Sequence, residues 1–174
     1  EEIAKLLIEN RADVNKANEV GITPLYAAID SRLKDIAKLL IDKGARVDKA
    51  DQYGSTLHAA IQSRLEDIAK LLIENGARVD EVDETGFTPL FGAVASGYTD
   101  IALRLIANGA NVNNTNNDGN TPLHYAAIYG NTDIALRLIA KGADVNLADQ
   151  DGNTPLHLAT EFDSIEVASV LIQQ

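Results

Sequence analysis

The feature that most constrains the fold is a repeat of about 33 residues that runs through the whole chain. Five glycines mark it, at spacings of 33, 32, 33 and 33 residues: Gly21, Gly54, Gly86, Gly119 and Gly152. A fixed period of this length is typical of repeat architectures, in which each unit is one small supersecondary element. The period therefore predicts a row of similar units rather than a single closed globule.

The unit from Asn116 to Asn146 shows most clearly what each repeat forms. Thr121 can cap a helix with its hydroxyl, and Pro122 suits the first helical position, where its missing N–H costs nothing. A short helix to about Tyr129 follows, and Gly130 supplies the left-handed residue that ends it. A second helix, 134–140, is apolar nearly all round, so we expect it to be covered on more than one side.

One such unit cannot bury its own apolar surface, but similar units stacked side by side can bury each other's. Small residues at matching positions would let neighbouring helices approach closely: Ala28, Ala60, Ala93, Ala126 and Ala159. The expected fold class is therefore an all-α repeat solenoid.

The repeated motifs resemble the ankyrin repeat. TPLH occurs at 121–124 and 154–157, TPLY at 23–26 and TPLF at 88–91, and the units close with GARVD, GANVN or GADVN. The resemblance implies helix-turn-helix units joined by β-hairpin loops. It also implies a single ankyrin repeat domain over 1–174, with a partial repeat at 1–17, full repeats at 18–50, 51–82, 83–115 and 116–148, and a truncated repeat at 149–174.

Several positions depart from the repeat pattern. The second unit is one residue short and has no proline, so Ser55 is the expected cap and Thr56 the first helical residue. Arg32, Arg64 and Asp163 replace the glycine that ends the first helix elsewhere. Either these residues keep a left-handed backbone, at about 1 kcal/mol each, or the turn changes shape.

The two ends lack the polar outer face expected of capping repeats. The chain begins inside a second helix, and it stops at Gln174 without a closing extended segment. We expect a piece of a longer protein that is a monomer, with weak end-to-end stacking at high concentration.

Composition excludes several classes of function. The chain has no cysteine, no apolar run long enough to span a membrane and no signal-peptide pattern at its start. We expect a soluble protein of the cytoplasm, with a secreted effector as the alternative. The formal net charge of -11 argues against nucleic acid and anionic membranes as partners and favours a basic or neutral protein.

The histidines at 58, 124 and 157 fall at the same place in three units, where Tyr26 and Phe91 stand in two others. A repeated position filled by such different residues predicts a structural role, since catalytic sites are built from unlike residues that converge. The family resemblance implies that this histidine forms hydrogen bonds within and between neighbouring turns.

Other chemistry finds little support in the sequence. Asn114, Asn116, Asp118 and Gly119 partly match a calcium loop, but the leading Asp is missing and Tyr125 stands where the bidentate Glu belongs. No catalytic or phosphate-binding motif occurs. The expectation is a protein that is not an enzyme and that needs no cofactor and no metal.

The resemblance implies that a partner protein binds at the hairpin tips and the exposed face of the first helices, which line a concave groove. On the helix face we expect contacts from Tyr125, Ile128, Tyr129, Glu161, Phe162 and Asp30, and at the tips from Tyr53, Phe87, Asp118 and Asp151. Aromatic residues dominate binding hot spots, which singles out Tyr129 and Phe162. Two alternatives stay open: the aromatics pack locally between units, or the chain is a structural spacer in a larger protein.

Overall fold

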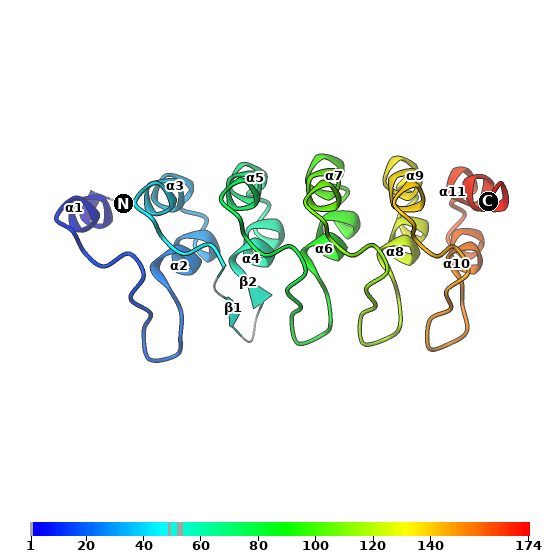
Figure 1. The fold of residues 1–174 in the computed structure, drawn as a ribbon, viewed down its shortest axis with the longest axis horizontal. Coiled ribbons are helices and arrows are strands. Elements are labelled where there is room, and N and C mark those ends of the chain that lie inside the picture. The colour runs from blue at the N-terminus through cyan, green and yellow to red at the C-terminus, as the bar shows by residue number, and fades with distance from the viewer. Residues whose placement is uncertain (1, 49, 52–53) are drawn as a thin grey trace. The chain divides into compact units, whose positions relative to one another are not determined.

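The computed structural model describes residues 2–48, 50–51 and 54–174. These residues form two compact units, Glu1–Glu81 and Val82–Gln174, here called unit 1 and unit 2. Each contains helix pairs in a row, and in unit 1 the single helix α1 precedes them (Figure 1). Tyr53, expected at a hairpin tip, lies outside the described residues.

Unit 1 contains α1 (Glu2–Glu9), α2 (Pro24–Asp30), α3 (Lys34–Asp42), β1 (Ala50–Asp51), β2 (Gly54–Ser55), α4 (Thr56–Gln62) and α5 (Glu66–Glu74). The first helices α2 and α4 pack against each other, and α3 packs between α1 and α5. The strands β1 and β2 form a two-stranded antiparallel ladder in which Ala50 lies opposite Ser55.

Unit 2 contains α6 (Pro89–Ala95), α7 (Thr99–Ala107), α8 (Pro122–Ile128), α9 (Thr132–Ala140), α10 (Pro155–Glu161) and α11 (Ile165–Ile172). The first helices α6, α8 and α10 form one layer and the second helices α7, α9 and α11 form the other. The hairpin loops extend from the layer of first helices (Figure 1). This arrangement confirms the expected all-α stack of repeats.

The first helices begin where the capping residues predict. Thr121 accepts a hydrogen bond from the backbone N–H of His124 and so completes a capping box. Ser55 caps α4 in the same way, with Thr56 as the first helical residue, so the shortened second repeat keeps its helix register. The missing residue falls in the loop, where length changes are tolerated.

The turns between paired helices keep one geometry whichever residue occupies them. Arg32, Arg64 and Asp163 have φ angles of 57°, 59° and 54°, close to the 65° of Gly130. In each case the next residue donates a backbone hydrogen bond back into the first helix, as Leu65 does to Ala60 at 2.8 Å. The left-handed alternative is therefore the correct one, and the turn is not reshaped.

Aliphatic residues fill the core of both units, and the five alanines expected at helix contacts are buried. The second helix α9 is covered on more than one side, as expected, although one of its apolar residues remains exposed. Leu136 on α9 is 46% exposed, although Ile134, Ala135 and Leu138 of the same helix are buried. Helix α9 packs against α8 of the same repeat and against α7 and α11 of the neighbouring repeats, while the side that bears Leu136 stays open to solvent.

Candidate functional site

The shape of each hairpin tip in unit 2 depends on the residue that opens it. Asp83 Oδ1 accepts hydrogen bonds from the backbone N–H groups of Thr85 and Phe87, at 2.9 and 3.0 Å. Asn116 and Asp149 accept the equivalent pairs in the next two tips. Such Asx turns hold a loop without help from a ligand, so these three side chains are structural.

The three tips are also bonded to one another. The backbone N–H of Asn117 donates to the Thr85 carbonyl at 3.1 Å, and that of Gln150 donates to the Asp118 carbonyl at 2.9 Å. The side-chain amides reinforce these links, since Gln150 Nε2 donates to the Asn117 carbonyl at 2.7 Å. The sequence analysis did not predict these hydrogen bonds between tips, here called the ladder of tips. The available signal was an amide side chain at the same position of successive tips, in Asn117 and Gln150.

Four aromatic rings form a cluster that starts in the core of unit 2 and ends at its surface. Phe91 is fully buried, and its ring lies 5.1 Å from Phe87 and 5.5 Å from Tyr125. Phe87 meets Tyr125 edge-on at 5.3 Å, and Tyr125 lies 6.2 Å from Tyr129. Edge-on and tilted contacts at these distances are the favourable ones for aromatic pairs. The last ring, Tyr129, is 54% exposed.

Tyr125 has an altered acidity because of its place in this cluster. Burial raises the pKa of its hydroxyl above 10.0, and the charges of Tyr129 and Asp118 raise it further, while the Asn116 side chain opposes them. Tyr125 therefore stays protonated and neutral at physiological pH.

The structure brings most of the predicted contact residues into unit 2. Phe162 is 51% exposed at the end of α10, the same position that Tyr129 occupies on α8, and these two helices pack together. Ile128 is half-buried beside Tyr129, and Glu161 is exposed beside Phe162. Phe87 is half-buried, because its ring packs against the rings of Phe91 and Tyr125.

The predicted acidic residues are divided between the units. Asp118 and Asp151 are exposed on neighbouring tips of unit 2. Their carboxylates, like that of Glu161, form no hydrogen bond or ion pair with any residue that the structure describes. Asp30 is exposed on α2 and belongs to unit 1.

The histidines connect backbone groups. The backbone N–H of Thr121 donates to His124 Nδ1 at 3.1 Å, which leaves the ring proton on Nε2, 3.0 Å from the Asn153 carbonyl in the next repeat. Burial lowers the pKa of His124 below 6.5, against smaller opposing effects from Asn153 and Asp149. His58 and His157 accept the same bond from Ser55 and Thr154.

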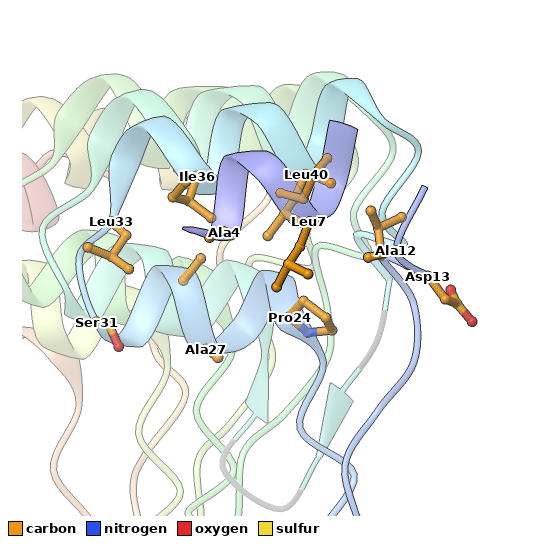
Figure 2. A pocket seen from close by; sticks show the side chains of 13 residues that line it. Ala4, Leu7, Ala12, Asp13, Pro24, Ala27, Ser31, Leu33, Ile36 and Leu40 are labelled. Atoms are coloured by element: carbon orange, nitrogen blue, oxygen red, sulfur yellow. The ribbon is translucent and has the colours of Figure 1, made fainter. Parts of the chain in front are cut away.

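An apolar pocket of about 330 Å³ lies in unit 1, between α1, α2 and α3 (Figure 2). Leu7, Ile36 and Leu40 line its inner side, and Pro24 and Ala27 belong to the face of α2 that borders it. The first helices α4, α8 and α10 each pack against the first helix of the preceding repeat, whereas α1 packs on α3. The pocket is therefore the gap beside an unpaired first helix rather than a set of converging polar groups.

Metal-binding clusters and membrane-spanning helices are absent from the part of the chain that the structure describes. No group of three or more His, Cys, Asp or Glu side chains there is placed to hold a metal ion. None of the helices described is long and apolar enough to cross a membrane.

Comparison with known proteins identifies the repeat. A family model described as ankyrin repeats (3 copies) matches residues 1–83, 50–116 and 90–174, and these matches together span the chain. A search of curated proteins finds no match to the sequence.

Proposed function

Because this chain belongs to the ankyrin repeat family, we propose that it is a protein–protein interaction module whose partner binds unit 2 at the exposed end of its aromatic cluster. Ankyrin repeats are generally modules of this kind and are typically not enzymes. The proposed binding surface, called the aromatic face below, comprises Phe87, Asp118, Tyr125, Ile128, Tyr129, Asp151, Glu161 and Phe162.

The exposure of Tyr129 and Phe162 is the observation that carries this proposal. Both rings are about half open to solvent at the same position of two packed helices, while Phe91 in the same unit is fully buried. Half-exposed aromatic rings on a rigid support can bury a large apolar area against a partner at a small cost in conformational entropy. The Tyr125 ring contacts both Tyr129 and Phe87, so it links the exposed ring to the rest of the cluster.

A second candidate function is a spacer that positions other domains. The hydrogen-bonded ladder of tips through Asn117 and Gln150 favours it, because bonds between successive repeats make an array resist bending. A spacer would make no use of an exposed aromatic pair. The two functions therefore differ in what happens when those rings are removed.

Site-specific photo-crosslinking separates the two functions. A photoreactive phenylalanine analogue is placed at Tyr129 and, as the matched control, at Leu136, which is similarly exposed but lies on α9. We expect a defined crosslinked protein from cells of the source organism with the Tyr129 probe alone, and a weaker yield when Phe162→Ala is added. Equal yields from both positions, or no effect of Phe162→Ala, would argue for the spacer.

We further propose that residues 1–174 act as one repeat domain and as a monomer. Exposed apolar side chains on α1 and α11, including Leu6 and Ile172, support weak association of copies at high concentration. Sedimentation velocity over a range of concentrations tests this, and a stable dimer at micromolar concentration would contradict it.

A further inference from the structure

Charge is unevenly distributed over unit 2. Its basic residues are Arg104, Arg137 and Lys141, which lie on the second helices α7 and α9 or at the end of α9. The segments 82–98, 115–131 and 148–164, which hold the tips and first helices, contain no lysine and no arginine. The same segments carry acidic residues: Asp83, Glu84, Asp118, Asp149, Asp151, Glu161 and Asp163.

Unit 1 does not show the same separation. It has Arg32 and Arg64 directly after the first helices α2 and α4, at the position where unit 2 has Gly97, Gly130 and Asp163. These arginines adopt a left-handed backbone that glycine would adopt more easily. The absence of cations beside the first helices is therefore specific to unit 2 and is not imposed by the repeat.

The exposed aromatic rings lie among acidic groups that have no internal partner. Tyr129 and Phe162 are exposed at the ends of the packed helices α8 and α10, and the tips and helix ends of the same repeats carry Asp118, Asp151 and Glu161, whose carboxylates are exposed and unpaired within the described residues. The charge of Asp118 contributes, after burial and Tyr129, to the raised pKa of Tyr125 in this cluster. An apolar partner would bury these charges without compensation, which is unfavourable.

We infer that the aromatic face of unit 2 binds an arginine-bearing segment of its partner protein. This inference rests on the proposed function and adds the chemistry of the partner. A guanidinium group can stack flat on an exposed aromatic ring such as that of Tyr129, and its N–H groups can pair with carboxylates, so the aromatic face offers arginine both kinds of contact. Lysine offers a single strongly hydrated charge and no flat surface, so arginine fits both parts of this face better.

The test begins with a displayed library of random 12-residue peptides. Selection uses the whole chain as bait, and the double variant Tyr129→Ala, Phe162→Ala serves as the counter-selection bait. We expect the surviving peptides to be enriched in arginine over lysine. Circular dichroism of the double variant checks that it folds, as expected for two exposed side chains.

The strongest peptide is then measured by fluorescence anisotropy at physiological salt. Replacing its arginines with citrulline, which keeps the shape but removes the charge, is expected to weaken binding about tenfold or more. The double variant Asp118→Asn, Glu161→Gln should weaken the arginine peptide by about five- to tenfold. The matched control Glu166→Gln, an exposed carboxylate on α11, should leave affinity unchanged.

The outcomes separate this inference from the proposed function. Peptides that require Tyr129 and Phe162 but are not enriched in arginine would overturn the inference and leave the proposed function intact. Arginine-rich peptides that bind the Tyr129→Ala, Phe162→Ala variant equally well would also overturn it. The same holds if Glu166→Gln weakens binding as strongly as Asp118→Asn, Glu161→Gln does, because net charge alone would then explain binding. Failure to obtain any face-dependent peptide counts against the inference, while crosslinking from position 129 tests the proposed function independently.

Discussion

His124 donates a hydrogen bond from Nε2 to the backbone carbonyl oxygen of Asn153, 3.0 Å away in the next repeat. The same ring accepts a bond from the backbone N–H of Thr121 through Nδ1. One buried side chain thus joins the start of α8 to the following hairpin tip. His157, at the equivalent place in the last repeat, is exposed and forms only the local bonds to Thr154.

Replacing His124 with phenylalanine, the residue that position 91 carries, should destabilise the chain by about 1 to 3 kcal/mol. The substitution leaves the Thr121 N–H and the Asn153 carbonyl without their partner, while it keeps a ring in the core. Urea unfolding followed by circular dichroism measures the free energy of unfolding. His157→Phe is the matched control and should cost less. An equal cost at both positions would show that the bond between repeats contributes little.

The stability of the chain should depend on the protonation of His124. Its pKa lies below the 6.5 of an unfolded histidine, because burial disfavours the charged ring. The unfolded chain therefore takes up a proton first as the pH falls. The contribution of His124 is fully present above pH 6.5 and declines as the pH falls toward the pKa of the folded state.

Urea unfolding at intervals from pH 7.5 to pH 5 tests this dependence. The difference in unfolding free energy between the natural chain and His124→Phe should narrow as the pH falls, while contributions from the many carboxylates cancel in the comparison. A difference that stays constant, or that widens toward low pH, would contradict the direction of the shift.

Gly86→Ala should destabilise unit 2 more than Gly152→Ala does. Both glycines have a left-handed backbone, with φ of 79° and 83°, so both alanines incur about 1 kcal/mol of backbone strain. A Cβ at position 86 would also lie 2.8 Å from Asn117 Oδ1 and 3.0 Å from the Asn117 backbone nitrogen, whereas one at position 152 meets nothing within 4 Å. The contact should add about 1 to 2 kcal/mol, measured by chemical unfolding. Equal losses would indicate that the tips can move apart freely.

Arg64→Gly should stabilise the chain by about 0.5 kcal/mol. The φ of 59° at this position strains a residue with a Cβ, and glycine removes the strain but adds freedom to the unfolded chain, so the net gain is smaller than the strain itself. The reverse substitution, Gly97→Arg, should destabilise by a similar amount, since nothing lies within 4 Å of a Cβ there. Thermal unfolding of both variants against the natural chain is the measurement. A loss of stability in Arg64→Gly would point to an interaction of the arginine side chain.

Much of the fold could be predicted from the sequence because its signals are local. The capping threonines before each proline and the glycines that end the helices act within one repeat, and the spacing of the glycines gives its length. Thr121 and Ser55 cap their helices as expected, and the turn at Arg64 takes the left-handed form, one of the two alternatives that the sequence left open. Successive repeats show the same local preferences for helix starts and turns, so each repeat supports the interpretation of the others.

Only the tertiary structure shows which side chains of different repeats contact each other. Phe87 and Phe162 both qualified as candidate contacts, yet Phe87 packs against Tyr125 of the next repeat while Phe162 stays half exposed. Leu136 proved to be open to solvent although its helix is apolar on nearly every side. Exposure depends on which neighbour a side chain meets after stacking, and the residues that make that neighbour lie about 30 positions away. The sequence by itself determined the structure of one repeat and the number of its copies, because both follow from local backbone preferences. Packing between successive repeats determined which side chains remain free to bind.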